Sequence, residues 1–517
     1  MSTPAVGTER ASLGAWIAVM AGIIGAFMAT LDISVTNSSL PQIQGEIGAN
    51  GTEGTWITTA YLVAEIVMIP LTAWLTRVMG LRLLLVSCTL AFVVFSVVCG
   101  VAQTLPQMII GRIGQGFFGG ALMPTAMTII GTRLPVNQQP QGLALFGITV
   151  VLAPVFGPLL GGWLTENVSW HFLFLLNVPV GGLLVVMLLV GLEHEETRFA
   201  DLLKADWLGV VGLTVCLGTL TVVLEEGQRE RWLESGYILR LLAISAVGLL
   251  LVVLSQVYSR DPVLKLSLLR LPSFAAACIL SVVMGGAFFT GVYIIPVFLA
   301  QIAGYNAQES GVVAMYSGAS AMLLIPAVPY MLRTLDIRLL VGTGVILYAS
   351  ASWLDIGLTA ETSGNNFILS QFLRGISQVL IFMPLSQGAL AGFRPEESAD
   401  ASALFNVARN LGASIGLALT AVAVDTRFAF HKQELVQAIR WQGFETDGGM
   451  TAMFSERSPD MAHAATQGLA ALSGLVSREA LVMTYADCFW IFGLAILMTL
   501  PFALLLRPPE GLSPMVH

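Results

Sequence analysis

The chain has 517 residues, of which 56% are hydrophobic and only 11% are charged, and its mean hydropathy is +0.81. Because soluble proteins carry about 25% charged residues, this composition excludes an ordinary water-soluble protein and predicts an all-α polytopic membrane protein. The net charge of −8 says little about partners, but the absence of a basic surface argues against nucleic-acid binding. The five cysteines lie in apolar stretches without metal-ligand spacing, so we expect neither a metal site nor a cofactor.

The apolar runs between polar breaks predict about 14 membrane spans of roughly 20 residues each. The first run, 14–36, is too long for the apolar core of a signal peptide, so it is expected to remain as the first helix. The expected spans begin near Gly14, Thr55, Leu81, Gln107, Gln141, Trp170, Asp206, Ile238, Phe274, Ala307, Leu339, Phe367, Ala401 and Leu481.

Lysine and arginine residues in the short loops fall almost entirely on one side of these spans. Such residues are concentrated in cytoplasmic loops, so the bias predicts cytoplasmic N- and C-termini. The short loops of the opposite side hold Arg229 and Arg231. The predicted cytoplasmic set is Arg10, Arg77, Arg82, Arg133, Arg198, Lys204, Arg260, Lys265, Arg270, Arg333, Arg338, Arg394 and Arg507.

Two carboxyl groups are expected at membrane depth, Asp32 in the first span and Glu65 in the second. Burial disfavours an ionised carboxylate, so both are candidates for exchanging protons. For Asp32 the alternative is a hydrogen-bonding anchor between helices. Glu65, with several apolar residues on each side, is the favoured proton site.

Arg112 lies near the start of the fourth span. A guanidinium beside a carboxylate would keep that carboxylate ionised until protonation or substrate binding rearranged the pair. This role would make Arg112 part of proton coupling. The alternative is a static salt bridge between the first and fourth spans.

Residues 147–164, GITVVLAPVFGPLLGGWL, combine prolines and glycines in one apolar run. Proline sets a bend, and glycine lets helices approach closely. We expect a tightly packed conformational pivot here; the alternative is an ordinary glycine-rich packing helix. The residues of the predicted pivot are Pro154, Gly157, Pro158, Gly161 and Gly162.

Arg409, in the thirteenth span, is followed by the small-residue run 412–416, which would allow its helix to pack closely. We predict that Arg409 faces a cavity and, with Asn406 on the same face, binds an anionic group of a substrate. Two alternatives remain open: capping of Arg409 by backbone carbonyls, or an ion pair with Asp487.

A polar insert at 425–480 separates the last two spans and is expected to be a periplasmic loop. It contains two stretches compatible with amphipathic helices. A solvated loop is one interpretation. The other is a docking surface for a periplasmic adaptor, with Trp441 and Phe444 as aromatic anchors.

The two halves of the chain repeat. Arg77 and Arg82 in one R-x4-R-L-L element correspond to Arg333 and Arg338 in another, and the segment at Arg112 corresponds to that at Arg374, with offsets of 333 − 77 = 256 and 374 − 112 = 262. Arg374 is therefore a further substrate-binding candidate. Such repeats are typical of transporters that rock around a central site. The predicted units are residues 1–191, a six-helix bundle; 192–272, two extra helices; and 273–517, a second six-helix bundle containing the insert.

Several motifs together resemble the major facilitator superfamily, most closely its 14-helix drug:proton antiporters of the EmrB-like branch. Residues 147–164 resemble the antiporter motif, with Ala153 where its first glycine is expected, and 31–41 (LDISVTNSSLP) resemble the first-helix motif, in which we expect Asn37 to bind substrate. GRIGQG at 111–116 and WHFLFLLNVPVG at 170–181 resemble two further elements.

One element departs from this resemblance. The cytoplasmic loop after the second span retains Arg77, Gly80 and Arg82 but lacks the usual acidic member. This departure weakens any inference that an aspartate within this loop gates the cytoplasmic side.

The resemblance implies proton-driven efflux of hydrophobic or weakly acidic toxic compounds across the bacterial inner membrane by alternating access. It also implies a periplasmic adaptor and an outer-membrane channel as partners. Neither a phosphate-binding loop nor an enzymatic motif is present, so we expect neither ATP-driven transport nor an enzyme. A proton-coupled uptake symporter and a non-transporting membrane sensor or scaffold are the alternatives.

Overall fold

The computed structural model describes residues 11–135, 137–195, 197–198, 206–259, 262–390, 393–441 and 461–506. Over these residues the chain forms helices and no strand. Thirteen helical runs are long and apolar enough to cross a membrane, and α8, bent by 45° after Pro154, makes the fourteenth. The predicted all-α fold with 14 spans is confirmed.

The first six spans form one bundle of the molecule. Its helices are α1 (Leu13–Ser38), α2 (Leu40–Glu46), α3 (Gly51–Gly54), α4 (Trp56–Met79), α5 (Leu81–Gly100), α6 (Leu105–Gly119), α7 (Leu122–Arg133), α8 (Gln139–Asn167), α9 (His171–Leu175) and α10 (Asn177–Gly191). Helix α1 packs on α7, α8 and α10, so it lies at the centre of this bundle.

The last six spans form a second bundle. Its helices are α13 (Pro272–Gln301), α14 (Ala307–Leu324), α15 (Val328–Thr334), α16 (Ile337–Leu354), α17 (Ile368–Leu390), α18 (Pro395–Trp441), α20 (Met461–Leu497) and α21 (Leu500–Ala503). Helices α13 and α18 approach backbone to backbone, since a Cβ on Gly285 would lie 2.5 Å from the Arg409 carbonyl oxygen and one on Gly412 would lie 2.1 Å from that of Val282. This contact fixes the position of Arg409 along α18.

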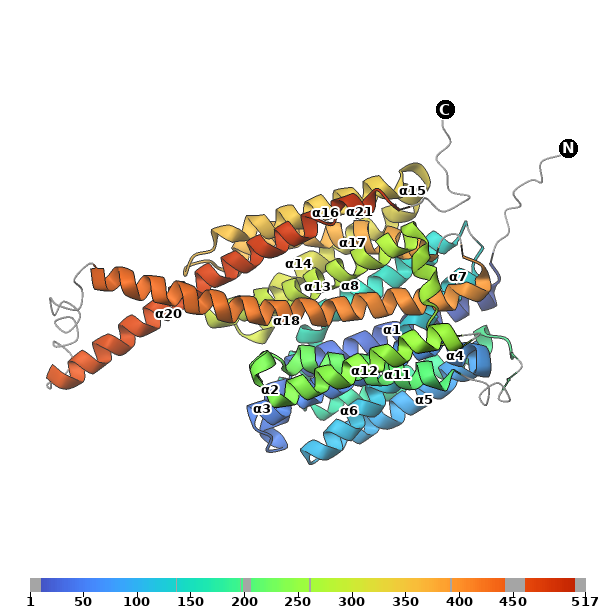
Figure 1. Cartoon of the computed structure of the whole chain (residues 1–517), viewed down its shortest axis with the longest axis horizontal. Coiled ribbons are helices and arrows are strands. Elements are labelled where there is room, and N and C mark those ends of the chain that lie inside the picture. Colours follow the sequence, from blue (N-terminus) through green and yellow to red (C-terminus); the bar gives the residue numbers. More distant parts are fainter. Residues whose placement is uncertain are drawn as a thin grey trace.

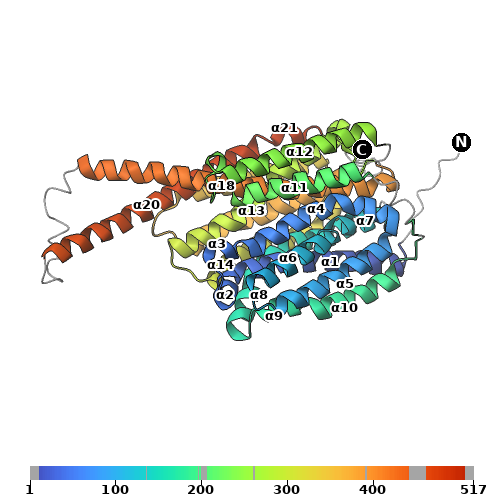
Figure 2. The same ribbon diagram turned by 60° about the horizontal axis from the view of Figure 1, so that its bottom comes forward.

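Two further helices, α11 (Trp207–Glu226) and α12 (Gly236–Tyr258), lie between the bundles in the sequence. They pack tightly on each other, because a Cβ on Gly248 would lie 2.5 Å from the Cys216 nitrogen. Helix α11 also contacts α4 of the first bundle and α18 of the second (Figure 2). The pair therefore covers the seam at which α4 and α18 meet.

Helices α18 and α20 run past the ends of the other helices (Figure 1). The insert at 425–480, expected to be a periplasmic loop with two stretches compatible with amphipathic helices, is helical where the structure describes it. Helix α18 continues through 425–441, and 461–480 belong to α20. We call these two segments the stalk. Phe444 and the side chain of Trp441, the expected aromatic anchors, lie outside the described residues.

The stalk is fixed to the bundle at its base. Asp487 accepts hydrogen bonds from Arg427 Nε at 2.5 Å and pairs with His431 Nε2 at 2.7 Å. Arg478 donates to the backbone oxygens of Ile302 and Ala360. These contacts join α18 to α20 and α20 to the second bundle.

The opposite end of the bundle holds the first and last described residues. Ala11 donates to Gln138, and Arg338 Nε donates to the Leu506 oxygen at 2.8 Å. We call this end the terminal face, and the end that carries the stalk the stalk face.

Candidate functional site

A central cavity of about 160 Å³ lies between the two bundles. It extends from the stalk-face ends of α1, α4 and α11 to the middle of α17 and α18. A cavity needs only about 15 Å³ to hold one water, so this space can be hydrated. Its lining residues are Thr30, Ile33, Asn37, Thr58, Leu62, Glu65, Ile66, Met123, Pro154, Glu225, Phe288, Phe289, Phe382, Arg409, Asn410, Ala413, Ser414 and Leu417.

Glu65 and Arg409 reach this cavity from opposite bundles. They lie close enough to interact electrostatically, although no hydrogen bond joins Glu65 to another described residue. Arg409 contacts the sulfur of Met123 and lies 3.5 Å from the Asn410 amide oxygen. The alternative pairing of Arg409 with Asp487 is not observed, because Asp487 is held by the base of the stalk.

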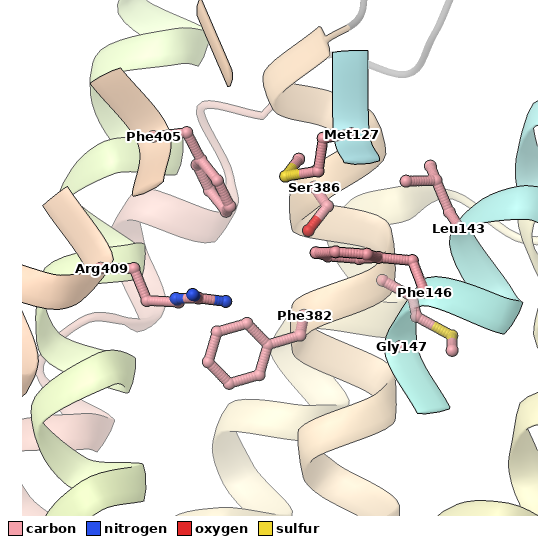
Figure 3. Close-up of a pocket in the computed structure, with 9 residues that line it drawn as sticks. Met127, Leu143, Phe146, Gly147, Phe382, Ser386, Phe405 and Arg409 are labelled. Carbon is pink, nitrogen blue, oxygen red and sulfur yellow. The ribbon is translucent and has the colours of Figure 1, made fainter. Parts of the chain in front are cut away.

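The small space beneath Arg409 is closed by large side chains. Figure 3 shows the guanidinium extending from α18 toward Phe382 on α17, with Phe405 on the same side and Met127 and Phe146 across from it. These side chains separate the central cavity from the terminal face. At the other end of the cavity Asn37 is exposed, so the cavity extends to the stalk face in this conformation.

Asp32 and Arg112 form a separate, fully buried centre inside the first bundle. Arg112 Nη1 donates to Asp32 Oδ2 at 2.5 Å, and neither side chain is exposed. Arg112 Nε donates to the Ile57 oxygen at 3.1 Å, and the guanidinium carbon lies 4.2 Å from the ring centre of Tyr61. Neither Asp32 nor Arg112 lines the central cavity.

Two amide side chains complete this centre, and sequence reasoning did not predict their roles. Gln115 Nε2 and Asn177 Nδ2 donate to Asp32 Oδ1 at 3.1 and 2.7 Å, and both also contact the Ser96 hydroxyl. Gln115 lies in the GRIGQG motif and Asn177 in WHFLFLLNVPVG, so the motifs marked the residues without revealing that they converge on one carboxylate.

Of the four residues predicted to bind substrate, two line the cavity and two lie elsewhere. Arg409 and Asn37 line the cavity, and Asn37 accepts a hydrogen bond from Thr58 at 2.7 Å. Arg374 and Asn406 do not. Arg374 is buried in a 2.7 Å ion pair with Asp355, which sequence reasoning missed.

Asn406 points toward the first bundle rather than into the cavity. Its amide donates to the Ser402 oxygen and to the Met127 sulfur. Arg374, selected because it corresponds to Arg112 in the repeat, and Asn406, selected because it shares a helix face with Arg409, do not line the cavity in this conformation. Substrate binding by either residue stays a prediction.

The terminal face is closed by contacts between the bundles. Arg77 Nη1 on α4 lies 2.6 Å from Asp400 Oδ1 on α18, and Lys265 Nζ lies 2.9 Å from Asp400 Oδ2. Arg333 donates to the Asn137 oxygen, and Ser402 donates to the Pro124 oxygen. The loop after α4 lacks the usual acidic residue, and Asp400 of the other bundle supplies a carboxylate to Arg77 instead.

The remaining loop residues have local roles. Gly80 has φ 77°, a backbone conformation that favours glycine, and it lets α5 begin beside Glu195. Glu195 accepts from the Leu81 nitrogen at 2.8 Å and pairs with Arg133 at 2.7 Å. Arg82 makes no ion pair with another described residue.

Helix α8 is bent within the predicted pivot and packs against α1. Ser34 donates to the Pro154 oxygen at 3.2 Å. A Cβ on Gly157 would lie 2.0 Å from Ser34 Oγ, and one on Gly161 would lie 2.9 Å from the Val35 oxygen. Gly162 instead faces open space, so it takes no part in the close contact between α1 and α8.

We expect Gly157→Leu to reduce transport at least tenfold while the protein still inserts. The added side chain must push α1 and α8 apart, and overpacking of this kind costs about 1–3 kcal/mol. Gly162→Leu, five residues further along the same helix and on a different face, is the matched control and should transport at the parental rate. Equal behaviour of the two variants in a vesicle efflux assay would contradict a role for the α1–α8 contact.

Comparison with known proteins identifies the family. The family model described as Major Facilitator Superfamily matches residues 22–417. The chain belongs to the major facilitator superfamily.

Relatives within the superfamily cover almost the whole chain. The chain is 32% identical over 445 residues to the colistin resistance protein EmrB of Acinetobacter baumannii, covering 86% of this chain and 87% of that protein. It is 28% identical over 497 residues to the multidrug export protein EmrB of Escherichia coli K12, covering 94% of each. The predicted resemblance to the EmrB-like branch is confirmed.

A solved structure agrees on the fold. The human organic anion transporter MFSD10 (TETRAN) superposes with a TM-score of 0.59 at 14% identity, covering 95% of this chain and 99% of that one. The superfamily fold therefore accounts for both bundles.

Proposed function

We propose that the protein exports hydrophobic toxic compounds across the bacterial inner membrane in exchange for protons. It works by alternating access, with both termini in the cytoplasm. The observation that carries this proposal is a cavity between the two bundles, into which Glu65 and Arg409 project from opposite sides. The names of the EmrB relatives support export as the direction of transport.

Protonation of Glu65 would couple the gradient to the conformational change. An ionised Glu65 attracts Arg409, whereas a neutral Glu65 does not, so proton binding weakens one interaction between the bundles. The contacts of Asp400 with Arg77 and Lys265 at the terminal face must break when the cavity opens to the cytoplasm. The buried Asp32–Arg112 pair is the second element of coupling, since it joins α1 to α6 beneath the cavity wall.

The stalk supports a role as the inner-membrane part of a three-part pump. Alternating access needs only short links between helices, but here two helices project well beyond the bundle (Figure 1). Phe430, Val436 and Leu475 are exposed on the projecting segments. We propose that the stalk binds a periplasmic adaptor, which connects the transporter to an outer-membrane channel.

Shortening the stalk should separate resistance from transport. We expect replacement of residues 436–472 by a flexible Gly/Ser linker to leave efflux in vesicles unchanged and to abolish resistance in whole cells. The variant retains Arg427, His431, Arg478 and Asp487, so the base of the stalk stays intact. Unchanged cellular resistance would contradict adaptor binding, and loss of vesicle efflux would show that the segment serves the transport cycle itself.

Proteoliposomes with an imposed pH gradient test the export proposal. The purified protein should move hydrophobic dyes against their concentration gradient only when protons flow in the opposite direction. Movement in the same direction as protons would indicate a symporter. Absence of any gradient-dependent movement across a chemically varied panel would indicate a sensor or scaffold.

A further inference from the structure

Glu225, at the end of the inserted helix α11, faces the central cavity. Sequence reasoning passed over it because it lies at the edge of an expected span, next to Glu226 and close to Arg229. The structure separates the two carboxylates. Glu226 pairs with Arg229 at 2.6 Å and accepts from Thr55, whereas Glu225 lies beside the Ser414 hydroxyl on α18.

No cation among the described residues pairs with Glu225. One of its oxygens, Oε1, is out of contact with solvent and has no hydrogen-bond partner. The nearby Arg229 is engaged by Glu226 and Glu230, and Arg409 interacts with Glu65. A carboxylate with one oxygen buried and no cationic partner is costly, and a positively charged ligand would satisfy it.

The rest of the lining agrees with a cationic ligand. The charged lining residues are Glu65 and Glu225 against Arg409, so the ionised cavity carries an excess of negative charge. Phe288, Phe289 and Phe382 supply aromatic rings, whose faces attract cations and whose surfaces bind apolar groups. Arg409 shares the cavity with these two carboxylates, so its charge alone does not make the cavity attractive to anions.

We propose that Glu225 makes the cavity selective for hydrophobic organic cations, so that the inserted helix pair supplies a specificity determinant that neither bundle contains. This inference rests on the proposed export function and names its substrate class. It also gives α11 a role in recognition, since its carboxylate enters the cavity at the seam between α4 and α18.

Two probes of equal size and opposite charge test the proposal. Tetraphenylphosphonium and tetraphenylborate differ in charge but hardly in shape or apolar surface. We expect the full-length purified protein to bind the phosphonium more tightly than the borate. Glu225→Gln should weaken phosphonium binding by about tenfold or more, the typical effect of losing a contact to a charged group, without weakening borate binding.

Glu226→Gln is the matched control, because it removes the adjacent carboxylate that does not line the cavity. It should leave the preference for the phosphonium intact. Glu225→Asp, which keeps the charge, should retain part of the preference.

Three results would overturn the proposal: tighter binding of the borate by the parental protein, parental phosphonium affinity in Glu225→Gln, or an equal loss of both probes in that variant. These results differ from failure of the export function itself. If the parental protein moves any dye in response to the pH gradient, export stands whatever the role of Glu225.

Discussion

Asp32→Asn is expected to destabilise the protein and to abolish gradient-driven transport. The asparagine oxygen can still accept from Gln115 and Asn177, but its amide nitrogen would then face Arg112 Nη1, placing donor against donor. Arg112 would lose the only carboxylate with which it pairs among the described residues. Removing one member of a buried ion pair costs about 3–5 kcal/mol.

The double variant Asp32→Asn/Arg112→Gln separates stability from coupling. It removes both charges of the pair, so no uncompensated cation remains at this buried centre. Thermal unfolding should return toward the parental temperature, whereas proton-driven efflux should stay absent. Parental efflux in the double variant would show that the pair only ties α1 to α6.

Glu65→Gln is expected to abolish accumulation driven by a pH gradient with little change in stability. Glutamine keeps the size of the side chain, and Glu65 makes no hydrogen bond or ion pair with another described residue that the change would break. What is lost is the ability to bind and release a proton while facing Arg409.

Two assays on the same proteoliposomes should show this difference. Exchange of labelled for unlabelled substrate, which requires no net proton movement, should continue in Glu65→Gln, while uphill transport should cease. Glu65→Asp, which retains a titratable group, should restore part of the uphill rate. Full gradient-driven transport by Glu65→Gln would show that a group other than Glu65 carries the proton.

Most of the fold could be predicted because long apolar runs identify the segments that span the bilayer. The first twelve spans begin within two residues of the expected positions, but α18 and α20 begin 401 − 395 = 6 and 481 − 461 = 20 residues earlier than expected. Hydropathy reports where a helix enters and leaves lipid and not where it begins or ends, so it leaves open whether the polar stretches of the insert are solvated loop or amphipathic helix.

The sequence identifies individual charged residues of the site, but it does not predict which of them interact with one another. Charges in the middle of apolar runs, such as Asp32, Glu65 and Arg112, were conspicuous. Glu225 and Asp355 lie at span ends, where a charge is ordinary in water. Only the packing of distant helices buries Asp355 and places Glu225 in the wall of the cavity. The partners of Arg374 and Arg409 depend on the same packing, which no local pattern encodes.

The position of α11 and α12 also makes the two seams between the bundles differ in their exposure to lipid. Two seams join the bundles, one at α4 and α18 and the other at α8 and α14. Helix α11 contacts both helices of the first seam, whereas the second contains the bent α8. The central cavity is lined by residues of α4, α11 and α18 and by no described residue of α14, so a compound dissolved in the membrane beside the first seam would meet the inserted pair before it reached the cavity.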